Sequence, residues 1–182
     1  MVNNFMKTKK ITIYTDGAAR GNPGKAGWGA VILYPYPASP LLRGRSKPIC
    51  RTGREGVVEL GGRSPYATNN QMELTAPIEA LKSLSRFDLD NDAQIEIFSD
   101  SKYVILGITE WIFGWQKNNW RNAAKKPVLN KEFWQELFSF SQKFKIKWNY
   151  VAGHAGDKWN ERADEIATGF ADGLKVQLKK EK

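Results

Sequence analysis

Two aspartates end two segments that share one pattern. The segments "ITIYTD" (11–16) and "IEIFSD" (95–100) both read isoleucine, any residue, isoleucine, aromatic, hydroxyl, aspartate. This alternation predicts two strands, in which Asp16 and Asp100 share the face of the aromatic residue before them. In parallel neighbouring strands in register, the two carboxylates would lie about 4.8 Å apart. Such a pair would repel without a cation, which favours a metal site over the alternative that each aspartate only caps the following turn or helix.

Other residues with chemical potential lie on predicted helices and loops. Glu73 falls near the start of a helix predicted for 69–85, and Asp164 lies one helical turn after Asn160. The alternative for either acid is a solvated helix face. His154 is the only histidine, and the glycines that flank its loop favour a mobile surface position. These residues could join the aspartate pair if the fold brings them to the same end of the sheet.

Apolar periodicity gives the order of the elements that must position these residues. Strands are predicted at 11–16, 27–34, 57–63, 93–100 and 146–153, and helices at about 69–85, 101–113, 130–143 and 158–178. Strands joined by short turns pair antiparallel, whereas strands separated by helices are parallel. The sequence therefore predicts an α/β fold with a five-stranded mixed sheet, three antiparallel strands followed by parallel ones, flanked by helices.

Charge and composition limit the class of protein. The chain has 182 residues and a net charge of +9, with basic residues concentrated in 35–56 and 114–131, which favours a polyanionic partner such as nucleic acid. The single cysteine, Cys50, excludes an intrachain disulfide and a cysteine metal site, and favours a reducing, cytoplasmic setting. No apolar run is long enough to span a membrane, and the first ten residues lack the apolar core of a signal peptide.

Five motifs together resemble the type 1 ribonuclease H family, the bacterial-type ribonuclease HI. They are "TDGAARGNPG", "TNNQMELTAPIEAL", "FSDSKYV", "KKPVLNKEFWQEL" and "VAGHAGDKWNERADEIA", and they span about residues 10–170. The resemblance implies the ribonuclease H-like fold and an endonuclease that hydrolyses the RNA strand of RNA–DNA hybrids. It further implies products with 5′-phosphate and 3′-hydroxyl ends and no strong sequence specificity.

The resemblance also implies roles for individual residues. It carries over four catalytic carboxylates, Asp16, Glu73, Asp100 and Asp164, as ligands of two Mg²⁺ ions, with Mn²⁺ as a substitute, and oxygen ligands suit both ions. It makes His154 a catalytic residue that assists proton transfer or product release. The implied substrate-binding residues are Gly17, Gly21, Asn22, Thr68, Asn69, Asn70 and Gln71, together with Trp115, Lys117, Trp120, Lys125 and Lys126 of a basic protrusion at 114–128. For Trp111, packing and recognition both remain open.

Three segments lie outside the resemblance or depart from it. We expect a flexible tail at 1–9, one ribonuclease H domain at 10–172 and a C-terminal extension at 173–182, whose last residues, "KVQLKKEK", should be frayed. The basic insertion at 35–56 is either a second contact to nucleic acid or a plain surface loop. We expect a monomer with no obligate protein partner. The competing functions are a nuclease or strand-transfer enzyme acting on DNA, and a non-catalytic hybrid-binding module.

Overall fold

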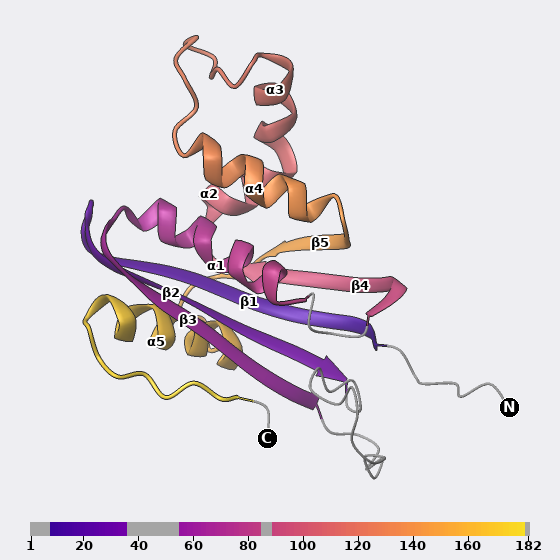
Figure 1. Ribbon diagram of the computed structural model, residues 1–182, viewed down its shortest axis with the longest axis vertical. Coiled ribbons are helices and arrows are strands. Elements are labelled where there is room, and N and C mark those ends of the chain that lie inside the picture. The colour runs from indigo at the N-terminus through magenta and orange to yellow at the C-terminus, as the bar shows by residue number, and fades with distance from the viewer. Residues whose placement is uncertain (1–7, 36–54, 85–88, 181–182) are drawn as a thin grey trace, which may run out of the picture.

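A five-stranded sheet forms the framework of the protein (Figure 1). The structure, a computed structural model, describes residues 8–35, 55–84 and 89–180. The strands are β1 (Thr8–Gly21), β2 (Gly24–Pro35), β3 (Glu55–Ala67), β4 (Leu89–Ser99) and β5 (Lys145–Tyr150), in the spatial order β3-β2-β1-β4-β5. The β1–β2 and β2–β3 pairs are antiparallel, and the β1–β4 and β4–β5 pairs are parallel. The predicted mixed sheet is therefore confirmed.

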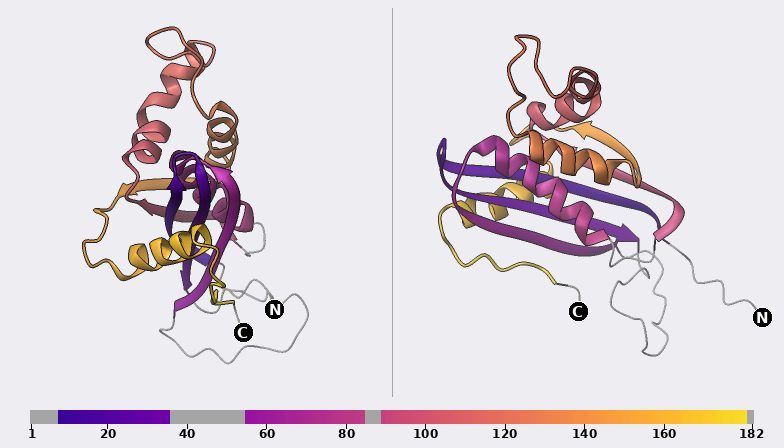
Figure 2. Two further views of the ribbon diagram at one scale, coloured as in Figure 1. Left: turned by 90° about the vertical axis from the view of Figure 1, so that its left-hand side faces the viewer. Right: turned by 45° about the horizontal axis from the view of Figure 1, so that its top comes forward.

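Helices cover both faces of the sheet (Figures 1 and 2). They are α1 (Asn69–Ser83), α2 (Lys102–Leu106), the π-helical turn η2 (Gly107–Trp111), α3 (Ile112–Lys117), α4 (Lys131–Ser141) and α5 (Lys158–Ala171). The helix α1 lies on one face, with α4 packed beside it, and α5 lies alone on the other face. The helical segment that begins at Lys102 continues to Lys117, so the predicted protrusion at 114–128 begins inside a helix.

The strand β1 is buried on both faces, which places its residues in two different hydrophobic cores. Ile11 and Ile13 point into the larger core beneath α1 and α4, whereas Tyr14 belongs to the smaller core beneath α5. Alternation along the strand then directs Asp16 toward the α5 side. Asp16, a predicted metal ligand, thus lies on the central strand of the sheet.

The first three strands extend at both ends beyond the segments predicted for them, whereas β5 ends at Tyr150, three residues before its predicted end. β1 continues to Gly21 through "GAARG", where small residues and Arg20 carry no apolar alternation to reveal a strand. It begins at Thr8, inside the predicted tail at 1–9, and residues 1–7 lie outside the described part of the chain. The predicted insertion at 35–56 also lies outside it, except for Pro35 at the end of β2 and the first two residues of β3.

Helix α5 ends at Ala171, seven residues before the end predicted for it. Gly173 has a φ of +76° and donates its N–H to the carbonyl of Phe170, while the N–H of Leu174 bonds to Gly169. This arrangement satisfies the last carbonyls of the helix and turns the chain back. The prediction of a frayed end is wrong for the described residues 175–180, which return to β3, where Lys179 hydrogen bonds with Glu59. No helix in the described ranges is long and apolar enough to cross a bilayer.

Candidate active site

Asp16 and Asp100 meet because their strands are parallel neighbours in register. Tyr14 pairs with Phe98 and Thr15 with Ser99, so each aspartate follows the same position of its strand. The rings of Tyr14 and Phe98 stack with centroids 4.9 Å apart, which fixes the register from the side chains as well as from the backbone. The predicted juxtaposition of the two repeated segments is confirmed.

Glu73 joins the two aspartates from α1. Carboxylate oxygens of Asp16, Glu73 and Asp100 all lie within 4.8 Å of one another. The approach is possible because Gly17 has no side chain: a Cβ there would lie 2.3 Å from the backbone nitrogen of Glu73. Sequence reasoning treated Gly17 as a substrate contact and missed this packing role.

Asp164 reaches Asp16 from the opposite face of the sheet. It lies on α5, with its carboxyl group within hydrogen-bonding reach of that of Asp16. Gly29, the cross-strand partner of Asp16, permits this approach, since a Cβ there would lie 2.3 Å from the carbonyl oxygen of Ala163. The structure thus places the other three predicted acids around Asp16.

Burial and mutual repulsion make ionisation of this cluster costly. Burial, together with the charges of Asp100 and Asp164, raises the pKa of Asp16 to about 8. A hydrogen bond of 2.7 Å from the N–H of Gly17 offsets only part of this rise. Burial and the neighbouring Asp16 and Asp100 raise the pKa of Glu73 well above its ordinary value. A cation bound between these groups would remove the repulsion.

The donor atoms fit a divalent cation. Glu73 is 7% exposed, and its Oε2 is buried without a hydrogen-bond partner in the described structure, while Oε1 accepts from the amide of Asn69 at 3.3 Å. All the ligands offered are carboxylate oxygens, as hard cations such as Mg²⁺ prefer. Asn160, 2% exposed and one turn before Asp164, also has a buried amide oxygen that no described group satisfies. Sequence reasoning did not assign a role to that oxygen.

The β1–β2 turn and the start of α1 form one continuous surface. Asn22 accepts a hydrogen bond of 3.1 Å from the backbone N–H of Asn69, which places two predicted substrate-binding residues side by side. Gly21, with a φ of +90°, begins the turn, and Asn70 is exposed. Thr68 and Gln71 form a reciprocal capping box at the start of α1. The spacing Thr-x-x-Gln is the signal that could have revealed this role from the sequence.

His154 lies on the exposed loop between β5 and α5. Its φ is +51°, and Gly156 two residues later has a φ of +83°. The loop begins beside the acids, because a Cβ at Gly153 would lie 2.8 Å from an oxygen of Asp100. Asp157 ends the loop by capping α5 through the backbone N–H groups of Trp159 and Asn160.

The tryptophans of the protrusion are packed to different degrees. The ring centroid of Trp115 lies 5.3 Å from that of Trp134 and 5.9 Å from that of Trp111. Both Trp115 and Trp120 are half-buried against the larger core. Trp111 is 38% exposed, more than either of the two tryptophans predicted to contact substrate. Trp115 and Trp120 therefore help to pack the protrusion against the larger core.

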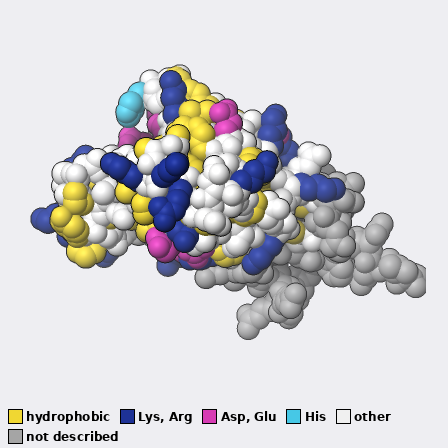
Figure 3. Space-filling view, turned by 90° about the horizontal axis from the view of Figure 1, so that it is seen from above, with side chains coloured by type: hydrophobic (Ala, Val, Ile, Leu, Met, Phe, Trp, Pro, Cys, Tyr) yellow, Lys and Arg dark blue, Asp and Glu magenta, His cyan; other side chains and the backbone are white. Residues whose placement is uncertain are grey.

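The basic residues of the protrusion lie at the end of α3 and on the loop that follows it. Lys117, Lys125 and Lys126 all face solvent. Arg121 donates to the carbonyl of Lys125 at 2.8 Å, and the side chain of Asn122 accepts from the N–H of Lys126 at 3.0 Å. Figure 3, which views the molecule from above, shows Lys and Arg side chains spread over this face.

A substitution at Gly17 tests the close approach between β1 and α1. We expect Gly17→Ala to displace Glu73, to lower kcat about 10²-fold and to destabilise the protein by about 1–3 kcal/mol. The matched control is Gly114→Ala, because a Cβ at this exposed helical glycine meets nothing within 4 Å and should stabilise the protein by about 0.5–1 kcal/mol. Thermal unfolding and steady-state kinetics measure both effects. Wild-type activity in Gly17→Ala would contradict the role assigned to this glycine.

Comparison with known proteins places this arrangement in a family. The model of the family described as RNase H matches residues 8–171. Ribonuclease H of Thermosynechococcus vestitus is 44% identical over 92% of both chains, and ribonuclease H of Zymomonas mobilis is 43% identical over 98% of this chain and 99% of its own. The solved structure of LC11-RNase H1 in complex with RNA/DNA hybrid aligns with a TM-score of 0.59 and 26% identity, covering 90% of this chain and 97% of the other. With four carboxylates gathered on such a scaffold, the chain belongs to the ribonuclease H family, type 1, and is an endoribonuclease.

Proposed function

We propose that this protein hydrolyses the RNA strand of RNA–DNA hybrids in a reaction that depends on two divalent metal ions, most simply Mg²⁺, and leaves 5′-phosphate and 3′-hydroxyl ends. The observation that carries the proposal is the convergence of Asp16, Glu73 and Asp100 within 4.8 Å, with Asp164 beside Asp16. The likeness to a relative solved with an RNA/DNA hybrid supports the substrate class.

The four carboxylates are the proposed metal ligands. Bound divalent cations would stabilise the charge that develops on the scissile phosphate and lower the pKa of the attacking water. The contribution of the chain is to hold the four acids together from β1, α1, α5 and the end of β4, two of them buried and two half-buried. His154, exposed on its loop, is proposed to move a proton near the leaving group or to assist product release.

Recognition of the hybrid is assigned to the surface around Asn22 and Asn69. Their amides both donate and accept hydrogen bonds, as a partner of the ribose 2′-hydroxyl must, and that hydroxyl distinguishes RNA from DNA. The backbone at Gly17 and Gly21 and the side chains of Thr68, Asn70 and Gln71 complete the proposed contacts. Because these groups would meet sugar and phosphate, binding should not depend strongly on sequence.

One assay distinguishes this proposal from the alternatives. The protein is incubated with labelled RNA–DNA hybrid, RNA duplex or DNA duplex in Mg²⁺ and then in excess EDTA, and the ends of the products are identified. Cleavage of only the RNA strand of the hybrid, lost in EDTA, supports the proposal. Cleavage of DNA indicates a DNA nuclease, and hybrid binding without cleavage indicates a binding module.

The lysines of the protrusion should make hybrid binding depend on salt. Each phosphate contact contributes about 0.9 to the slope of log K against log salt, so the double variant Lys125→Ala, Lys126→Ala should reduce that slope by about 1.8. Lys143→Ala, which removes an exposed lysine two residues after the end of α4, is the matched control. Binding is measured in EDTA at several salt concentrations to prevent cleavage. An unchanged slope in the double variant would remove these lysines from the interface.

A further inference from the structure

The C-terminal segment 174–180, hereafter the strap, is bound to the body of the protein through a buried carboxylate. Glu59 of β3 has a fully buried side chain. Its Oε2 accepts from the backbone N–H of Lys179 at 2.8 Å, and its own N–H donates to the carbonyl of Lys179 at 3.0 Å. The strap therefore contacts the edge strand of the sheet through its backbone.

Arg162 joins the strap and Glu59 to α5. Its guanidinium donates to both oxygens of Glu59 at 2.9 Å, to Glu165 at 3.0 Å and to the carbonyl of Gln177 in the strap at 2.9 Å. An ion pair with this many hydrogen bonds has a defined geometry, and loss of Arg162 would leave the buried charge of Glu59 unpaired. Arg162 thus forms hydrogen bonds to β3, to its own helix and to the strap.

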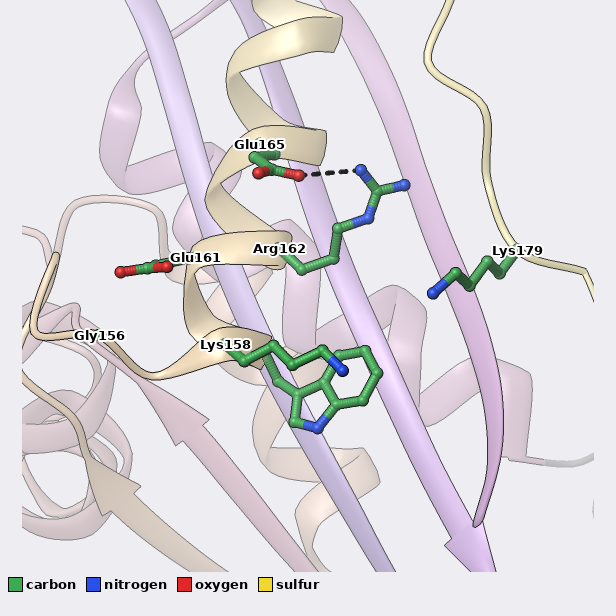
Figure 4. Close-up of a pocket in the computed structure, with 7 residues that line it drawn as sticks. Gly156, Lys158, Glu161, Arg162, Glu165 and Lys179 are labelled. Atoms are coloured by element: carbon green, nitrogen blue, oxygen red, sulfur yellow. Dashed lines mark hydrogen bonds and ion pairs between the residues drawn. The ribbon is translucent and has the colours of Figure 1, made fainter. Parts of the chain in front are cut away.

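The remaining strap contacts are apolar or involve an aromatic ring. Val176 packs on α5 where Gly169 has no side chain: a Cβ there would lie 2.7 Å from Val176. The ammonium groups of Lys179 and Lys158 lie 5.8 and 4.4 Å from the ring centroid of Trp159. Lys158, Trp159 and Lys179 line a cavity of about 300 Å³ at the start of α5, which Gly156 of the His154 loop also lines (Figure 4).

Arg162 and Asp164 lie on the same helix, which links the attachment of the strap to the acidic cluster. Two residues along an α-helix correspond to a rotation of about 200°, so the two side chains leave α5 on nearly opposite sides. Asp164 points to Asp16, and Ala163 between them rests on Gly29. Hydrogen bonds on the far side of the helix therefore resist rotation of α5 about its axis, the motion that would withdraw Asp164 from the other acids.

We infer that the strap is a positioning element: by holding Arg162 against Glu59, it sets the rotation of α5 and so the affinity of the acidic cluster for divalent metal. This inference rests on the metal site of the proposed function. It assigns positioning roles to Glu59, Arg162 and Val176, none of which touches the reacting groups.

The test is metal binding by the full-length protein without substrate. Mn²⁺ is titrated into metal-free wild type and into Glu59→Gln and Val176→Asp, and binding is measured by calorimetry. Each variant should require about fivefold more Mn²⁺ for half-saturation, within the range by which remote substitutions change coupling between sites. Leu174→Asp is the matched control, since Leu174 lies in the same segment but is 63% exposed. Trypsin cleavage at Lys175 and Lys179 reports whether the strap has been released.

Different results separate failure of the inference from failure of the proposed function. Faster strap cleavage with unchanged Mn²⁺ affinity would show that the strap only stabilises the fold and would overturn the inference. Equal weakening by Leu174→Asp would overturn it too. If Val176→Asp does not fold, Val176→Ala and Glu59→Gln decide the same question. Failure of the wild type to bind Mn²⁺ at the acids would instead remove the proposed metal site itself.

Discussion

Asp16→Asn is expected to abolish Mg²⁺-dependent cleavage of an RNA–DNA hybrid, with a loss of at least about 10³-fold in kcat/KM. Asp16 is the acid around which the others gather, because Asp100 and Glu73 lie within 4.8 Å of it and Asp164 contacts it from α5. Asparagine keeps the volume and one oxygen of the side chain but removes the charge that attracts a cation. The substitution therefore tests the charge of Asp16 while the shape of its side chain is conserved.

The measurement is single-turnover cleavage over a range of Mg²⁺ concentrations. Glu132→Gln, which neutralises an exposed acid on α4, serves as the matched control and should cleave like the wild type. Hybrid affinity in EDTA should survive in Asp16→Asn, because the proposed binding surface lies on other residues. Near wild-type cleavage by this variant would refute the assignment of the metal site.

The same substitution should stabilise the metal-free protein at alkaline pH. Asp16 has a pKa of about 8 in the folded protein and an ordinary value of 3.8, so between these values the folded state holds a proton that the unfolded chain has released. Stability from this group is therefore complete below about pH 4 and is lost as the pH rises through 8. Asp16→Asn removes this dependence, and at pH 8 in EDTA we expect a gain of at least about 2 kcal/mol, or about 5 °C in Tm.

Thermal unfolding at pH 5 and pH 8, with and without Mg²⁺, measures this effect. The Tm of the metal-free wild type should fall between the two pH values more than that of Asp16→Asn, and Mg²⁺ should restore the wild type at pH 8. Asp172→Asn is the control, since hydrogen bonding to Arg20 lowers the pKa of this exposed acid, and neutralising it should bring no gain. A metal-free Asp16→Asn less stable than the wild type at pH 8 would contradict the expected repulsion.

The sequence revealed the strands that carry chemistry better than it revealed the contacts that assemble the site. The repeated pattern ending at Asp16 and Asp100 predicted parallel neighbours in register, since alternation is a local property. Gly17 and Gly29 were not recognised as points of close approach, because that role depends on helices far along the chain. The early end of α5 did have a local signal, Gly173, at the position that favours a left-handed residue.

The contacts of the strap were not predicted from the sequence either. Glu59 and Lys179 are separated by 120 residues, and neither has a neighbouring motif that points to the other. A buried acid in β3 and a basic C-terminal segment each look like ordinary surface residues until the sheet places its edge strand beside α5. Such pairings follow from topology, which the sequence pattern predicts only in outline.

Because Glu73 and Asp164 approach Asp16 from opposite faces of the sheet, the acidic cluster is complete only when both helical layers are docked. A partly folded chain that has formed the larger core beneath α1 but not yet docked α5 lacks one of the four acids. If all four acids bind the metal ions, as proposed, cleavage of the hybrid requires both α1 and α5 to be docked on the sheet.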